Sequence, residues 1–166
     1  MKKSNNAFIQ TLRYICLIGV ISLGFITIIA TGGDGGILDY PDTLIGVIPV
    51  GSYPFGVAIN PDGNYVYVVN QRDNTLSVIQ TSDNTVVDTI YVGPSPLKLA
   101  ITPDGRYVYV THHIGEVDVI RTSDNTRIDY ISVGEHPNSI AISPDGSYVY
   151  VVNYADDTVS VIGYAE

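Results

Sequence analysis

The side chains best suited to chemistry in this sequence are its three histidines, His112, His113 and His136. An imidazole can act as a general acid or base near neutral pH, or as a metal ligand. Glu135 or Glu116 could complete a metal site with them. However, His112 and His113 are consecutive residues at the end of an expected strand, so their side chains point to opposite faces. We therefore predict neither a metal site nor a cofactor.

Other signatures of catalysis do not occur in the sequence. There is no Gly-x-Ser-x-Gly motif, no Cys-x-x-Cys-His motif and no tryptophan. The single cysteine, Cys16, lies in an apolar stretch, so the remainder offers neither a disulfide nor a thiolate ligand. The acidic pair Asp156-Asp157 suits a turn better than a calcium site. These observations predict a protein that is not an enzyme.

The histidines are positioned by a unit that occurs three times. Pro-Asp-Gly recurs at Pro61, Pro103 and Pro144, at intervals of 42 and 41 residues. The same shifts align a Val-Gly step, a later proline, and a Tyr-Val-Tyr-Val run in every copy. So many features in one register indicate a tandem repeat.

Each repeat divides into short strands joined by tight turns. In the first copy we predict strands at residues 55–60, 65–70, 75–80 and 86–92, with Pro-Asp-Gly and Ser-Asp-Asn turns between them. The second strand is apolar on both faces, so it must be covered on both sides. Radially stacked four-stranded blades supply that cover. We therefore predict an all-β fold of three four-stranded β-propeller blades, a partial propeller that oligomerisation could complete.

The repeats resemble the YVTN family of β-propeller proteins. The family's name motif is matched by Tyr67-Val-Val-Asn, Tyr109-Val-Thr-His and Tyr150-Val-Val-Asn. The resemblance covers residues 44–162 and implies a propeller in an archaeal or bacterial cell-surface or secreted protein. It implies no shared chemistry. We predict an exported or cell-surface module for protein or glycan binding or for envelope structure. The alternatives are a hydrolase similar to the phosphogluconolactonase propellers, or a fragment of a larger propeller.

Tracing the strands up and down places the loops on two opposite ends of the blades. The turns at one end repeat almost unchanged, whereas the loops at the other end differ from copy to copy. Function usually lies on loops that the architecture leaves free. The candidate binding residues on this variable end are Tyr53, Arg72, His112, His113, Glu135, His136, Tyr154, Asp156 and Asp157.

The front of the chain reads as a targeting segment. Lys2, Lys3 and Arg13 precede a 16-residue apolar run from Ile15 to Ala30. This pattern is typical of a secretory signal peptide, and an uncleaved N-terminal anchor is the alternative. We assign residues 1–30 to this segment, 31–42 to a Gly-rich linker, and 43–166 to repeats at about 43–88, 89–129 and 130–166. The expected location is periplasmic, cell-surface or secreted, with membrane contact only through an uncleaved segment.

The repeats begin out of phase with the blades. The segment from Thr43 to Val50 matches a fourth strand, whereas the last copy ends after its third. One hypothesis is a homodimer that exchanges this strand; the rivals are a fragment of a longer propeller and a stack that wraps its own first strand. Residues 31–166 hold five basic and 17 acidic residues, a net charge of −12. Such a charge disfavours nucleic acid as a partner, and any protein or glycan partner is unidentified.

Overall fold

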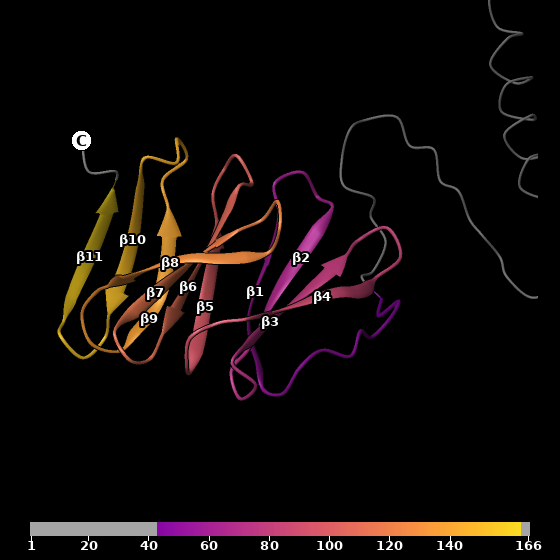
Figure 1. Cartoon of the computed structure of the whole chain (residues 1–166), viewed down its shortest axis with the longest axis horizontal. Coiled ribbons are helices and arrows are strands. Elements are labelled where there is room, and N and C mark those ends of the chain that lie inside the picture. Colours follow the sequence, from indigo (N-terminus) through magenta and orange to yellow (C-terminus); the bar gives the residue numbers. More distant parts are fainter. Residues whose placement is uncertain (1–42, 164–166) are drawn as a thin grey trace, which may run out of the picture. The chain divides into compact units, whose positions relative to one another are not determined.

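The computed structural model describes residues 43–163. The predicted signal or anchor segment, and the linker up to residue 42, lie outside the described residues. Between residues 43 and 163 the chain forms three antiparallel sheets and no helix. Within that range, accordingly, no helix is long and apolar enough to cross a membrane. Figure 1 shows the sheets side by side, each with its strands in chain order.

The three sheets are the blades that the sequence predicts. The first blade contains β1 (Pro54–Ile59), β2 (Tyr65–Asn70), β3 (Thr75–Gln80) and β4 (Thr85–Tyr91). The second blade contains β5 (Pro96–Ile101), β6 (Tyr107–His112), β7 (Glu116–Arg121) and β8 (Thr126–Ser132). The third blade contains β9 (Pro137–Ile142), β10 (Tyr148–Asn153) and β11 (Thr158–Gly163). The predicted all-β, partial-propeller fold is confirmed, and the strands of the first blade begin and end within one residue of the prediction.

The Pro-Asp-Gly turns have the backbone that their chemistry predicts. Gly63, Gly105 and Gly146 have φ values of 76°, 72° and 76°, a conformation that residues with a Cβ rarely adopt. In each turn the aspartate side chain accepts a hydrogen bond from the backbone N–H two residues later. The turns therefore fix the register of the first two strands of every blade.

Two of these turn aspartates predict how stability depends on pH. Hydrogen bonds from Thr102 and Arg106 hold the pKa of Asp104 at about 2, and bonds from Ser143 and Ser147 do the same for Asp145, against an ordinary 3.8. Because both pKa values are lower in the folded state, the stabilisation is complete above the ordinary pKa and is lost as the pH falls toward about 2.

We expect the melting temperature of the full chain to fall between about pH 4 and pH 2. Circular dichroism at a series of pH values measures this. The D104N/D145N variant should melt at a lower temperature at pH 6 and show a shallower decline in acid. A decline as steep as in the unaltered protein would contradict the assignment.

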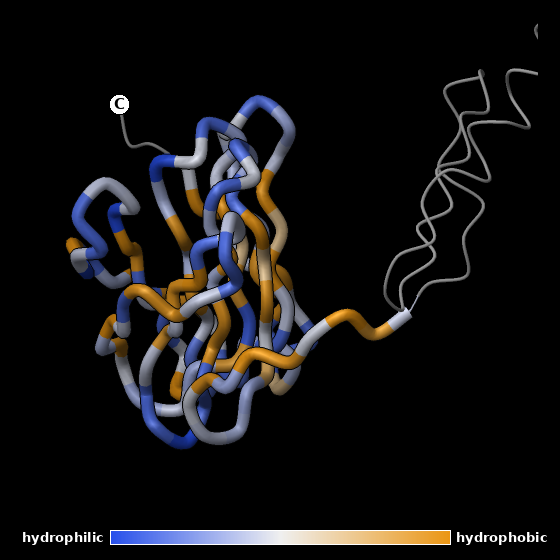
Figure 2. Tube along the Cα trace, turned by 90° about the vertical axis from the view of Figure 1, so that its right-hand side faces the viewer, coloured by the Kyte–Doolittle hydropathy of each residue, from blue (hydrophilic) through white to orange (hydrophobic). Residues whose placement is uncertain are grey.

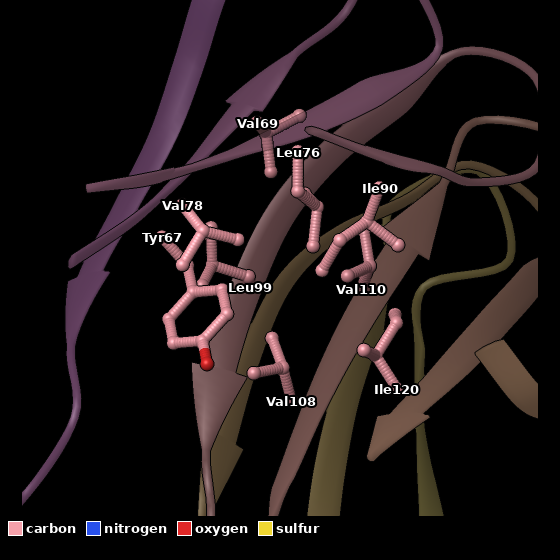
Figure 3. Close-up of a cluster of buried hydrophobic side chains, with 9 residues drawn as sticks. All are labelled: Tyr67, Val69, Leu76, Val78, Ile90, Leu99, Val108, Val110 and Ile120. Atoms are coloured by element: carbon pink, nitrogen blue, oxygen red, sulfur yellow. The ribbon is translucent and has the colours of Figure 1, made fainter. Parts of the chain in front are cut away.

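The blades are held together by apolar side chains on the faces where neighbouring sheets meet. Tyr67, Val78 and Ile90 of the first blade point toward Leu99, Val108 and Ile120 of the second (Figure 3). A second cluster around Val117, Val149 and Val151 joins the second and third blades. Figure 2 shows the same pattern along the chain, with hydrophobic strands and hydrophilic turns and loops. The middle blade is covered on both sides, as the doubly apolar strands require.

The leading segment (residues 43–50) differs from its prediction in the single chain. It forms no strand, and Leu44, Ile45 and Val47 are 84%, 94% and 81% exposed. A strand exists only when another strand pairs with its backbone. Among residues 43–163 the third blade has three strands, and no strand in this range pairs with the outer edge of β11.

Candidate functional site on the variable loop face

The loop face comprises residues 51–54, 71–74, 93–96, 113–115, 134–137 and 154–157, and one backbone feature recurs in it. The residue before the first proline of each blade has a left-handed backbone: Tyr53 (φ 54°), Ser95 (φ 54°) and His136 (φ 52°). Their carbonyls accept hydrogen bonds of 3.0–3.1 Å from the backbone N–H of Gln71, His113 and Tyr154. Non-glycine residues adopt this conformation at a cost, and such positions concentrate at functional sites. The three side chains therefore project from backbone segments that have the same conformation and the same hydrogen bond.

Two pairs of candidate residues meet on this face. The rings of His113 and His136 lie with their centroids 4.0 Å apart and tilted by 38°. His113 follows the second blade's β6, and His136 precedes the third blade's β9, so the pair spans the seam between these blades. In the first blade, the guanidinium of Arg72 lies 5.6 Å from the ring centroid of Tyr53. Both histidines are exposed and so are open to a solute.

The acidic candidates mainly shape the loops. Oδ2 of Asp156 accepts a 2.7 Å hydrogen bond from the backbone N–H of Glu135. In the first blade, Oδ2 of Asp73 accepts the equivalent 2.7 Å hydrogen bond from the backbone N–H of Ser52. Asp157 has a left-handed φ of 54° in its turn. The side chains of Glu135 and Tyr154 are exposed; Glu135 precedes His136 in the chain, and the backbone N–H of Tyr154 donates to the His136 carbonyl.

His112 lies inside the second blade rather than on the loop face. It is completely buried, and Nδ1 lies 3.1 Å from the carbonyl oxygen of Pro94. Its Nε2 lies 3.0 Å from Oδ2 of Asp118. Both neighbouring atoms, the Pro94 carbonyl oxygen and the Asp118 carboxylate oxygen, are hydrogen-bond acceptors. Strand alternation turned this histidine inward and His113 outward, so the two do not form one site.

Asp118 is the centre of this buried cluster. Its Oδ2 also accepts a 2.8 Å hydrogen bond from the backbone N–H of Gly93, and Oδ1 lies 2.7 Å from Nη2 of Arg127. Burial raises the pKa of Asp118, but His112, Gly93 and Arg127 together outweigh burial and leave the pKa below its ordinary value. The carboxylate is therefore ionised, lies between His112 and Arg127, and has no access to solvent.

Asp118 and Arg127 did not emerge from the sequence as site residues, yet the repeats contain a signal for them. Where the second blade has His112 and Asp118, the first has Asn70 and Ser77, hydrogen-bonded at 2.9 Å. The third blade repeats this arrangement with Asn153 and Ser160 at 2.8 Å. A position-by-position comparison of the three copies would have shown that His112 and Asp118 replace the asparagine and serine of the other two.

Two clefts lie away from the histidine pair. One of about 310 Å³ opens at the turn end between the first two blades; it is lined by Asn60, Asp62, Tyr65, Tyr67, Asp104, Gly105, Arg106 and Thr122. Burial, followed by the nearby Tyr65, Asp62 and Asp88, raises the pKa of the Tyr67 hydroxyl. The other, of about 370 Å³, is lined by Gly51, Asn70, Asp73, Thr75, Ser77, Thr89 and Tyr91 of the first blade. Among residues 43–163, no three histidine, cysteine or acidic side chains gather as a metal site would require.

Comparison with known proteins identifies relatives of this fold. The family model "Lactonase, 7-bladed beta-propeller" matches residues 81–166, just over half of the chain. None of the curated protein sequences matches. Hydrazine synthase from Kuenenia stuttgartiensis superposes with a TM-score of 0.65 at 28% identity, over 74% of this chain and 36% of that one.

Two further solved structures are candidate 6-phosphogluconolactonases. The Bacteroides fragilis protein has a TM-score of 0.64 at 21% identity, over 69% of this chain and 36% of its own. The Bacteroides uniformis protein has a TM-score of 0.60 at 20% identity, over 75% of this chain and 43% of its own. At this identity the likeness concerns the fold. The chain spans well under half the length of each of these three structures.

The prediction that this protein is not an enzyme is wrong at the level of the family, because the matching family is one of lactonases. The sequence contains no short catalytic motif from which this family could have been inferred. The resemblance to β-propellers in general is confirmed, whereas the specific assignment to YVTN repeats stays a prediction. By its match over residues 81–166, the chain belongs to the seven-bladed β-propeller lactonase family.

Proposed function

We propose that this chain forms part of a lactone hydrolase whose reacting groups lie where the second and third blades meet on the loop face. The observation that supports this most is the stacked pair of His113 and His136. Both residues fall within the stretch that matches the lactonase family. Both are also exposed, unlike the buried His112.

Opening a lactone needs a base that takes a proton from water and an acid that returns one to the departing ring oxygen. Imidazole is the side chain that most often does either near neutral pH. Two rings whose centroids lie 4.0 Å apart can both reach one bound lactone. In this arrangement one ring takes the proton from the attacking water, and the other donates a proton to the leaving ring oxygen.

The charge of the chain favours a substrate without phosphate. Residues 31–166 have a net charge of −12, which repels anions at the surface. An exported location, which residues 1–30 predict, agrees with a neutral sugar because phosphorylated sugars do not cross membranes. We therefore propose a neutral aldonolactone, such as glucono-δ-lactone, as the substrate class.

The test is acid release from glucono-δ-lactone by the purified full chain, corrected for spontaneous hydrolysis. We expect H113A and H136A each to lower kcat/KM by about 100-fold or more, since acid–base catalysis contributes about 10² to 10⁴. The matched control is S123A, an exposed turn residue of the second blade at the opposite end. Activity unchanged in both histidine variants, with unchanged melting temperatures, would refute the role of this pair.

A further inference from the structure

The open face of the third blade repeats the apolar side chains that the first blade buries. Four side chains of the first blade that face the second are at most 1% exposed: Tyr67, Val69, Leu76 and Val78. Their counterparts in the third blade are between 40% and 58% exposed: Tyr150, Val152, Val159 and Val161. The residue types are nearly the same, so this face matches one that packs against another blade.

The open face of the first blade provides the complementary surface. Phe55 and Val57 of β1 are 54% and 68% exposed. The equivalent residues of the second blade, Leu97 and Leu99, are 7% and 8% exposed against the first blade. One end of the stack thus has the surface that a blade presents to its predecessor, and the other end has the surface for its successor.

The leading segment matches the strand that the third blade lacks. Thr43 aligns with Thr85 and Thr126, which begin the fourth strands β4 and β8. Ile48 aligns with Ile90 of β4, which is buried between blades. The segment is apolar, and among residues 43–163 neither it nor the outer edge of β11 pairs with another strand.

The connection to β1 decides which blade the leading segment can complete. The equivalent connection, residues 92–95, links β4 to β5, so a fourth strand belongs to the blade before the β-strand that follows it. The three residues 51–53 span at most about 10 Å. The chain's own β11 is two blades away, or about 20 Å at the usual spacing of packed sheets (Figure 1). The chain therefore cannot easily complete its own third blade.

We propose that two copies of this chain associate head to tail, so that the third blade of each packs against the first blade of the other. The leading segment of each copy then pairs with β11 of its partner as the missing fourth strand. This single association buries the open apolar faces of the first and third blades, and it gives each leading segment a strand to pair with. The result is a ring of six blades, one fewer than the seven for which the matching family is named and within the range of about four to eight that propellers use.

The pairing seen within the chain specifies the register across copies. Ser77 lies opposite Thr89 in the first blade, and Asp118 lies opposite Tyr130 in the second. The corresponding positions are Ser160 and Val47, which would face each other between copies. Directly opposed side chains have Cβ atoms about 4.5–5.5 Å apart, close to the distance that a disulfide bridges.

The test is disulfide cross-linking between full-length chains in a Cys16→Ser background. Two differently tagged copies, one with V47C and the other with S160C, are co-expressed and mildly oxidised. We expect a covalent heterodimer with twice the chain's mass on a non-reducing gel. A V159C partner in place of S160C should cross-link much less, because consecutive strand residues face opposite sides.

Two outcomes would overturn the proposal. The first is an absence of the heterodimer while both thiols react with a maleimide and circular dichroism is unchanged. The second is an internal disulfide in a single chain with both V47C and S160C, which migrates at the mass of one copy and indicates a self-wrapped strand. Neither substitution removes a residue of the histidine pair, so the result is independent of lactone hydrolysis.

Discussion

Replacing Asp118 with alanine is expected to lower the free energy of unfolding by about 3–5 kcal/mol. The carboxylate is completely buried between His112 and Arg127 and also accepts the backbone N–H of Gly93. Its removal leaves a buried imidazole and a buried N–H without an acceptor, and a buried group that loses its partner keeps its full desolvation penalty. Urea unfolding of the full chain, followed by circular dichroism, measures the loss.

The neighbouring blades supply a control for this variant. They have a neutral Asn-Thr-Ser set in place of His112, Glu116 and Asp118. The triple variant H112N/E116T/D118S should return the unfolding free energy to within about 1 kcal/mol of the unaltered protein, because neutral groups that satisfy each other can replace a buried ion cluster. If D118A and the triple variant were equally unstable, the loss would not come from leaving the partners of Asp118 without an acceptor.

Replacing Leu76 with alanine is expected to lower the free energy of unfolding by about 2–5 kcal/mol. The side chain is completely buried in the cluster between the first two blades, where it lies near Val69 and Ile90 (Figure 3). Its truncation removes apolar contacts and leaves a cavity that the strands on both sides cannot easily close. Urea unfolding gives the value, and the slope of the transition shows whether the blades still unfold together.

Ile128 is the matched control for this core position. It lies on β8 in the middle blade, is 43% exposed, and has a neighbouring blade on each side. I128A should lower the unfolding free energy by only about 1 kcal/mol or less, mainly through strand propensity. A comparable loss in L76A and I128A would mean that the interface between the first two blades adds little to stability.

The repeats allowed most of the fold to be predicted. Pro61-Asp-Gly and its two counterparts specify hairpin turns by local chemistry, since proline presets one turn position and glycine accepts a left-handed backbone in another. Residues 65–69 are apolar on both faces, which required cover on both sides and so favoured stacked blades over a two-layer sandwich. The leading segment forms no strand in the single chain, where no strand of residues 43–163 pairs with it.

The candidate site was harder to predict, for two physical reasons. Alternation indicates that His112 and His113 face opposite ways, but it does not indicate which is buried. That depends on the acceptor across the sheet, Asp118, which lies on another strand. The stack of His113 on His136 joins two blades, and only the packing of blades brings them together. The lactonase-like interpretation was given only as an alternative, because no catalytic motif in the sequence pointed to it.

The left-handed residues Tyr53, Ser95 and His136 have a consequence for how this protein can change over time. Their backbone conformation is the same although their side chains are aromatic, hydroxylic and basic. Each such position costs about 1–3 kcal/mol unless it is glycine, and that penalty depends little on which ordinary side chain is present. Substitutions among ordinary residues can therefore change the side chains at these positions, and with them the specificity of the face, at little further cost in folding free energy. Glycine would relieve the backbone strain but would remove the side chain from the face.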